Sequence, residues 1–196
     1  SQLVQDAQRH GVEVLPPDVQ HSQVDTVLVG PAVAQAQPPV RLGLHLVAGL
    51  SIEAARRIVL ARESAPLQSV EDLTRRAQLS STEVRALATA DALRSLAGHR
   101  RQQVWEASAQ HRAPLLLRDA PVHEEALSLP APPEAEDIVF DYAALGLSLR
   151  RHPLALLRPH LAAERLLSAA QMHDFPNGRL ARACGIVTVR QQPGTA

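Results

Sequence analysis

The chain contains little cysteine and few aromatic residues. Cys184 is the single cysteine among 196 residues, which excludes an internal disulfide and any CxxC metal or redox site and suits a reducing compartment. Aromatic residues make up 2% of the chain, so the 45% of hydrophobic residues are mainly alanine, leucine and valine. We therefore expect an aliphatic core and mostly helical structure, because alanine and leucine favour helices.

Membrane and catalytic signals are also missing from the sequence. No apolar run approaches the roughly 18 residues of a membrane span, and the N-terminal residues lack the basic start and apolar segment of a signal peptide. The nine histidines show no HExxH pattern, and there is no P-loop, GxSxG or paired Cys and His motif. These absences predict a cytoplasmic chain with no membrane partner and with no catalytic residue, metal site or cofactor of its own.

Lysine is absent, so all 20 basic residues are arginine, and they balance 20 acidic residues. The charge is nevertheless sorted along the chain. Residues 41–112 carry eleven arginines against seven acids, residues 148–196 carry seven against two, and residues 113–147 carry one against seven. A polyanion is therefore expected to contact the two basic segments and to avoid the acidic segment between them.

Residues 41–112 show the strongest helical pattern. Ser51 is a good N-cap, Glu53 suits the positive start of the helix, and Arg57 follows Glu53 by four residues on the outside. Pro66 is expected to end this helical unit. An apolar stripe predicts its buried face: Ile52, Ala55, Ile58 and Val59.

Two further capping signals follow. Ser69 with Asp72, and Ser80 with Glu83, have the spacing of capping boxes. Each signal predicts the start of a helix. The residues expected to face inward are Val70, Leu73 and Ala77 in the first of these helices and Val84, Leu87 and Ala88 in the second.

Residues 89–93 are expected to interrupt the last of these helices. Asp91 is the residue there that tolerates a left-handed turn conformation. A helix resumes after Gly98, with Val104 and Trp105 as core candidates. The predicted order is helix, hairpin, helix, connector, helix, hairpin, helix.

The N-terminal part of the chain shows extended patterns beside this helical region. A helix over 3–10 is expected to end at Gly11, and residues 25–30 and 40–44 could pair as a β-hairpin. Residues 186–189 near the other end are typical of a strand. Because the chain starts inside a helical pattern and ends after this strand, we expect it to be an excised piece of a longer protein.

Residues 113–137 contain five prolines and little periodicity, which is typical of a linker. The densest carboxylates lie in or beside it. We expect a linker to be unable to hold them in the rigid geometry that metal-assisted chemistry needs. These carboxylates belong to Glu124, Glu125, Glu134, Glu136, Asp137 and Asp141.

The turn at residues 48–51 is the strongest candidate binding site. A turn of the form apolar-Gly-apolar-Gly between two helices directs backbone N–H groups toward a DNA phosphate without reading bases. Gly49 matches the first glycine, and Ser51 stands where the second is usual. A plain connector between packed helices is the alternative. The predicted phosphate-binding residues are Ala48, Gly49, Leu50, Ser51, Arg56, Arg57, Arg100 and Arg101.

Four stretches resemble, in order and spacing, the C-terminal half of bacterial C-family DNA polymerases. HGVEVLPPDVQHS (10–22) is similar to the family's VLPPD stretch at the end of the fingers. VRLGLHLVAGLSIEAARRIVLARESAPLQSVEDLTRR (40–76) is similar to its first hairpin region, and LATADALRSLAGHRRQQVWEA (87–107) to its second. LGLSLRRHPL (145–154) is similar to the element that leads to an OB-fold. The variants GLS, ADAL and LSLRRHPLALLRP resemble those of the error-prone branch, the second alpha-subunit-type polymerase of the mutagenesis cassette.

The resemblance implies a mainly α fold. The expected regions are a fingers-end segment with a short β-hairpin (1–40), a tandem helix-hairpin-helix domain (41–112), the linker (113–137), a helical segment before the OB-fold (138–180) and the first strand of an incomplete OB-fold (181–196).

The resemblance also implies a role in damage-tolerant DNA synthesis. The chain is expected to hold duplex template-primer DNA by its phosphates but not to polymerise, because the family's catalytic aspartates lie in an upstream palm domain. Mg²⁺ and deoxynucleoside triphosphates would serve the parent polymerase. Ala48 stands where the family usually has lysine, which implies weaker phosphate binding than in replicative relatives.

A protein-interaction module is the second hypothesis. In this interpretation the same helical pairs dock accessory subunits of the translesion complex, or mutasome, such as a Y-family-like polymerase subunit. The sliding clamp would be reached indirectly. The missing lysine at residue 48, the overall neutrality and the acidic linker favour this alternative.

Overall fold

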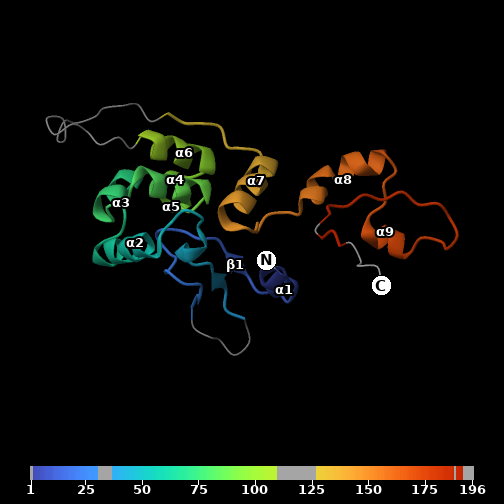
Figure 1. The fold of residues 1–196 in the computed structure, drawn as a ribbon, viewed down its shortest axis with the longest axis horizontal. Coiled ribbons are helices and arrows are strands. Elements are labelled where there is room, and N and C mark those ends of the chain that lie inside the picture. The colour runs from blue at the N-terminus through green and yellow to red at the C-terminus, as the bar shows by residue number, and fades with distance from the viewer. Residues whose placement is uncertain (1, 31–36, 110–126, 188, 192–196) are drawn as a thin grey trace. The chain divides into compact units, whose positions relative to one another are not determined.

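The computed structural model describes residues 2–30, 37–109, 127–187 and 189–191. Most elements are helices (Figure 1), which confirms the predicted fold class. The chain divides into two compact units, residues 1–149 and residues 150–196. The candidate interface lies in the first unit.

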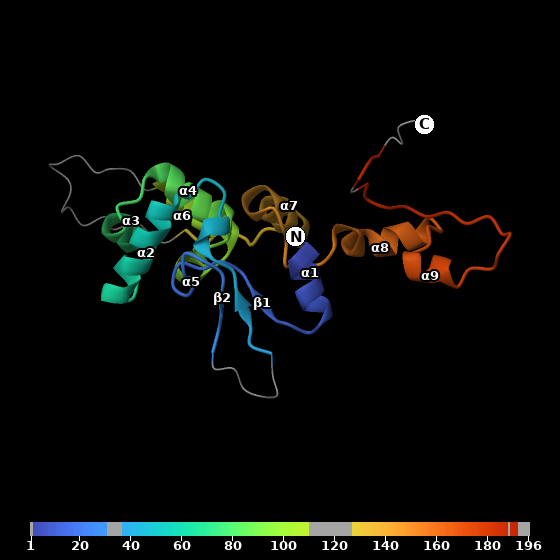
Figure 2. The ribbon, with the colours of Figure 1, turned by 60° about the horizontal axis from the view of Figure 1, so that its bottom comes forward.

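A small sheet follows the first helix. Helix α1 (Gln2–Arg9) ends before Gly11, whose φ is +80°. Strand β3 (Val40–Arg41) lies between β1 (Val14–Leu15), which is parallel to it, and β2 (Val27–Leu28), which is antiparallel (Figure 2). The predicted hairpin is thereby confirmed, with Val27 opposite Arg41.

The helical region begins directly after β3. The sequence predicts a helix before the turn at residues 48–51, here called the first turn. The structure has only η1 there, a 3₁₀ helix of three residues. Six elements follow one another with short connections. They are η1 (Leu44–Leu46), α2 (Ile52–Ser64), α3 (Val70–Arg76), α4 (Ser81–Thr89), α5 (Arg94–Ala97) and α6 (Arg100–Ala109).

Serine N-caps begin α2, α3 and α4, as predicted. The hydroxyl of Ser51 accepts from the N–H of Ala54 at 3.1 Å, and that of Ser69 accepts from the N–H of Asp72 at 3.1 Å. Of these three caps, that of α4 is a complete capping box, formed by Ser80 and its partner Glu83. Such caps stabilise a helix by about 0.5–2 kcal/mol each.

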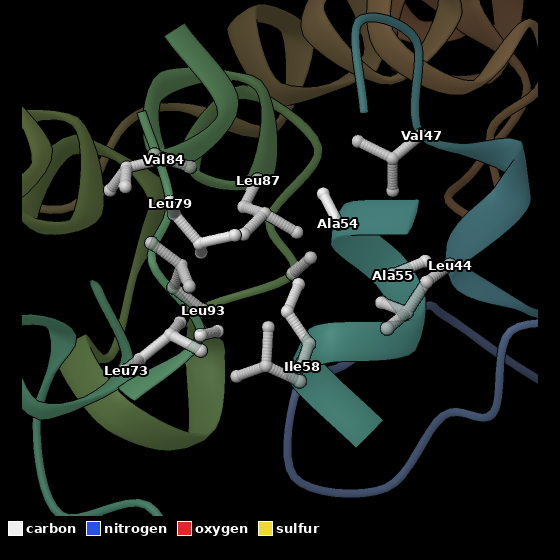
Figure 3. Packing of buried hydrophobic residues seen from close by; sticks show 14 of the residues in the cluster. Leu44, Val47, Ala54, Ala55, Ile58, Leu73, Leu79, Val84, Leu87 and Leu93 are labelled. Atoms are coloured by element: carbon white, nitrogen blue, oxygen red, sulfur yellow. The ribbon is translucent and has the colours of Figure 1, made fainter. Parts of the chain in front are cut away.

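The core is aliphatic and lies between α2 on one side and α3 and α4 on the other (Figure 3). Leu44, Ile58, Leu73, Leu87 and Leu93 are its largest fully buried apolar side chains. Each of these contributes about 1.5–3 kcal/mol by burial. This core fixes α2 against α4, and thus positions the turns that begin them.

The predicted burial of two residues is wrong. Ile52 is 50% exposed and Trp105 is 51% exposed. Ile52 is the first residue of α2, and the buried stripe begins at Ala54, farther along the helix. In α6 the buried face consists of Arg100, Gln103 and Ala107, so Trp105 lies on another side of the helix.

The segment around Asp18 ties the N-terminal part of the chain to the helices. Its carboxylate accepts from the Ser95 hydroxyl at 3.0 Å and from the Ser95 N–H at 3.3 Å, at the start of α5. The N–H of Val19 donates to the carbonyl of Ala92 at 2.9 Å. In addition, the buried Ser22 hydroxyl donates to the carbonyl of Leu42 at 2.7 Å. The VLPPD stretch is therefore structural, and it supplies a cap to a helix far along the chain.

Helix α7 (Glu134–Leu145) begins inside the range predicted as linker, and Gly146 follows it in the left-handed conformation. Residues 113–126 of the predicted linker lie outside the described residues. The expectation that these carboxylates lack rigid geometry is wrong for Asp137 and Asp141, because both are buried within α7. Helix α7 also contacts the turn at residues 48–51, through the carbonyl of Ala144.

The second unit contains α8 (Pro153–Ala163) and α9 (Ala169–His173), with an isolated bridge between Leu167 and Ala183. None of its described residues is buried. Residues 186, 187 and 189 are not assigned to a strand, and Thr188 lies outside the described residues. The OB-fold strand at 186–189 stays a prediction.

Candidate nucleic-acid interface

The first turn connects η1 to α2 and has the backbone conformation that glycine favours. Gly49 has φ +86°. A Cβ at this position would meet the Ala86 Cβ at 3.5 Å, which is an ordinary contact. The glycine is therefore required by the left-handed backbone rather than by lack of space.

The N–H groups of this turn divide into two sets. The N–H of Ala48 donates to the carbonyl of Ala144 in α7 at 2.8 Å, and that of Leu50 donates to the carbonyl of Val47 at 3.1 Å. Among the described residues, no acceptor is found for the N–H groups of Gly49, Ser51 and Ile52. These groups stand at the N-terminus of a helix of 13 residues, where the helix dipole favours an anion.

A second turn of the same kind lies at residues 77–80, before α4. The stretch AQLSSTEVRALATA (77–90) repeats AGLSIEAARRIVLA (48–61) at a spacing of 29 residues. Gln78 takes the place of Gly49 and also has positive φ, at +49°. Ser80 corresponds to Ser51, and both are N-caps.

Sequence reasoning missed this second turn, although the repeated A-x-L-S pattern is visible in the sequence. It placed the second hairpin at residues 89–93 instead. A turn is present there, and Asp91 has the predicted left-handed conformation with φ +59°. That turn connects α4 to α5, a helix of only four residues. The structural counterpart of the first turn is thus residues 77–80.

Glu83 joins the two turns. Its carboxylate completes the capping box of Ser80, and it also accepts from the Ser51 hydroxyl at 3.4 Å. The Arg57 guanidinium lies 3.6 Å from the same carboxylate and donates to the carbonyl of Ala77 at 2.8 Å. The starts of α2 and α4 are therefore held side by side.

The pKa of Glu83 lies below its usual value. Burial opposes ionisation and raises this pKa, but hydrogen bonds from the N–H and hydroxyl of Ser80, the charge of Arg57 and the Ser51 hydroxyl outweigh it. A carboxyl whose pKa is lower in the folded state stabilises the fold above its unfolded pKa of about 4.3, and this contribution is lost as the pH falls through the folded value.

We therefore expect the free energy of unfolding to decrease as the pH falls below about 4. The decrease should be smaller for Glu83→Gln, which cannot ionise. Urea titrations at several pH values between neutral and acid would measure both slopes. Glu164→Gln, at an exposed site in α8's C-cap, serves as the control and should keep the wild-type slope. Equal slopes for Glu83→Gln and wild type would contradict the expectation.

The predicted arginines differ in what they can offer to a phosphate. Arg56 is exposed, while Arg57 is half-buried and engaged by Glu83 and Ala77. Arg101 pairs with Glu136 of α7 at 3.0 Å. Arg85 was not predicted, but it is exposed and occupies the position in the second repeat that Arg56 occupies in the first. Within the described residues, neither Arg56 nor Arg85 forms a salt bridge.

The prediction that Arg100 binds phosphate is wrong. Its side chain is 2% exposed and is paired with two aspartates of α7, so it presents no surface to a polyanion. The sequence pattern suggested a phosphate ligand because two adjacent arginines follow a turn. Its buried partners come from α7, 37 and 41 residues later in the chain, and nothing in the spacing indicates them.

The described residues contain no group of three or more His, Cys, Asp or Glu side chains that could hold a metal ion. Within the same part of the chain, no helix has the length and apolar character needed to cross a membrane.

Comparison with known proteins agrees with this geometry. Residues 11–103 match the family model described as the helix-hairpin-helix motif. The chain is 53% identical over its whole length to the error-prone DNA polymerase of Bordetella parapertussis and to that of Burkholderia pseudomallei. It is 46% identical to the error-prone DNA polymerase of Alkalilimnicola ehrlichii. In each case it spans only 19% of the relative's length. The chain is thus similar over its full length to about a fifth of an error-prone DNA polymerase, and its helical region matches the helix-hairpin-helix motif.

Proposed function

We propose that this chain is a DNA-holding part of an error-prone DNA polymerase, which grips duplex template-primer DNA by its phosphates and performs no catalysis itself. The observation that carries the proposal is the first turn. Among the described residues, its N–H groups at Gly49, Ser51 and Ile52 have no acceptor and stand at the start of a helix of 13 residues, which also carries the exposed Arg56.

Backbone donors of this kind bind phosphate oxygens without distinguishing the bases. This suits a protein that must hold DNA of any sequence. The second turn adds a similar but weaker donor set, because the N–H of Ser80 is already bound by Glu83 at 2.8 Å. Arg85 lies at its side as Arg56 lies beside the first. The two corresponding turns, held together by Glu83, can contact phosphates of one duplex.

The parent protein would perform DNA synthesis across damage, with Mg²⁺ and deoxynucleoside triphosphates bound elsewhere in its length. The relatives are error-prone DNA polymerases by name, and the chain covers only 19% of their length, which supports this division. The missing lysine at residue 48 predicts modest affinity for this part alone, because one charged phosphate contact is replaced by Ala48.

Titration of a fluorescently labelled 20-base-pair duplex tests the proposal. We expect affinity to be the same for duplexes of unrelated sequence and to fall with salt, with a log–log slope of about −2 to −4 if two to four phosphates are neutralised. Anisotropy measured at several salt concentrations would give this slope. No binding at low salt, or binding that does not respond to salt, would contradict the proposal.

A protein-interaction role is the second candidate, and one observation favours it. An apolar groove of about 380 Å³ lies among α1, the sheet and the end of α7. It offers a surface on which an accessory subunit of a translesion complex could dock. Capture of such a subunit by the wild-type chain, lost on Val4→Glu in the groove wall, together with absent DNA binding, would favour this role over the first. The groove lining includes Leu3, Val4, Ala7, Val40, Leu42 and Leu147.

A further inference from the structure

Helix α7 forms a wall of the first turn, although the segment 110–126 separates it from the helices of residues 41–109. The carbonyl of Ala144 accepts from the N–H of Ala48 at 2.8 Å. Ala144 is buried in the same core as Val47 and Ala54, and Leu145 packs against that core. The turn proposed to bind phosphate is thus shaped partly by α7.

A buried charge cluster fastens α7 in this position. The Arg100 guanidinium donates to both the carbonyl and the carboxylate of Asp137, each at 2.7 Å, and is paired with the carboxylate of Asp141. It also lies 5.7 Å from the centre of the Phe140 ring. Asp141 additionally accepts from the Ser148 hydroxyl at 2.7 Å. Buried ion pairs of this kind are sensitive to the loss of one partner.

The cluster also changes the electrostatics of the acidic segment. Asp137 and Asp141 share Arg100, and Glu136 is paired with Arg101. These carboxylates therefore contribute less negative potential to the surface than the sequence suggests. Acidic α7 can lie beside a phosphate-binding turn because arginines of α6 neutralise much of its charge.

We propose that Arg100, Asp137 and Asp141 are positioning residues for the first turn and that the DNA-holding unit includes α7. By clamping α7, they hold the Ala144 carbonyl against the N–H of Ala48. This contact fixes the left-handed turn at Gly49, whose other N–H groups have no acceptor among the described residues and can bind phosphate. The inference rests on the proposed function for its effect on DNA, but the coupling between Arg100 and the turn can be measured without DNA.

The whole chain carrying Arg100→Met tests the inference. We expect hydrogen exchange at the Ala48 N–H to accelerate at least about tenfold, because its acceptor is released when α7 loosens. Duplex affinity should fall about tenfold while the salt slope stays at the wild-type value, since Arg100 itself touches no phosphate. Exchange at core amides of α4, such as Leu87, should stay protected.

Two controls separate positioning from direct binding and from general damage. Arg56→Gln should lower affinity and reduce the magnitude of the salt slope by about 0.9, the loss of one phosphate contact, without changing exchange at Ala48. Arg101→Met removes the neighbouring, half-exposed arginine and should change exchange at Ala48 less than twofold.

Arg100→Met could accelerate hydrogen exchange at all core amides, and Arg100→Lys is the second variant for that outcome. Lysine keeps the charge but cannot span both aspartates, so it should give intermediate exchange at Ala48 and intermediate affinity. Faster exchange at Ala48 with unchanged or higher affinity would overturn the inference, as would unchanged exchange in both variants. If the wild-type chain does not bind duplex, or if Arg56→Gln binds as well as wild type, the proposed function fails instead.

Discussion

Replacement of Gly49 by Asp together with Arg56→Glu should abolish duplex binding at moderate salt. The first change places a carboxylate among N–H groups that have no acceptor in the described part of the chain, and the second reverses the exposed charge of Arg56 in α2. Losing two charge-assisted contacts of about 1.5–3 kcal/mol each predicts a decrease of at least about 100-fold in affinity. Anisotropy titration of the double variant against wild type, at equal salt, measures this change.

The chain supplies a closely matched control for this double variant. Gly11 is also a glycine with positive φ, and the exposed Arg9 lies two residues before it at the end of α1. Gly11→Asp with Arg9→Glu therefore makes the same change in net charge and imposes similar backbone strain. We expect it to retain duplex affinity within about threefold, since it touches neither turn. Equal losses in both double variants would show that net charge, and not the first turn, governs binding.

The second large effect is expected on stability. Asp18→Ala should lower the free energy of unfolding by about 2–4 kcal/mol, because three part-buried hydrogen bonds to a charged acceptor are lost. The N–H groups of Gln20 and Ser95 and the Ser95 hydroxyl all donate to this carboxylate, which is buried. Chemical denaturation of the variant and of wild type would give the difference.

Asp25→Ala is the control for this substitution. The Asp25 side chain is 88% exposed and lies 3.9 Å from His45, so its removal should change stability by less than about 0.5 kcal/mol. A loss of comparable size in both variants would mean that the Asp18 contacts do not carry the stability assigned to them.

Local features of this fold were predictable because their causes are local. A serine followed three residues later by an acid satisfies the first N–H groups of a helix, and this identified the starts of α3 and α4. Two extended segments, one on each side of a loop, indicated the pairing of β2 with β3. Asp91 was recognised as a left-handed turn residue because its side chain tolerates that conformation.

The parts that could not be predicted depend on partners far away in the sequence. In the sequence Arg100 resembles a surface ligand, but α7 covers it in the structure. Trp105 resembles a core residue, but the buried face of α6 consists of other residues, two of them polar. The neighbouring prolines led to the expectation that the acids of α7 lie in or beside a linker. In each case tertiary packing overrides the local pattern. The exception is the turn at 77–80, which a search for internal repeats would have found.

The contact between Asp18 and Ser95 bears on how the chain is made. Its two residues are 77 positions apart, and a loop of that length must close before the N-terminus of α5 acquires its acceptor. During synthesis the VLPPD segment emerges before Ser95, so their contact cannot form until Ser95 has left the ribosome. The turns at 48–51 and 77–80 emerge in between, so α2 and α4 can pack on each other before the segment at 18–22 docks. Assembly of this region is then expected to run from the middle outward.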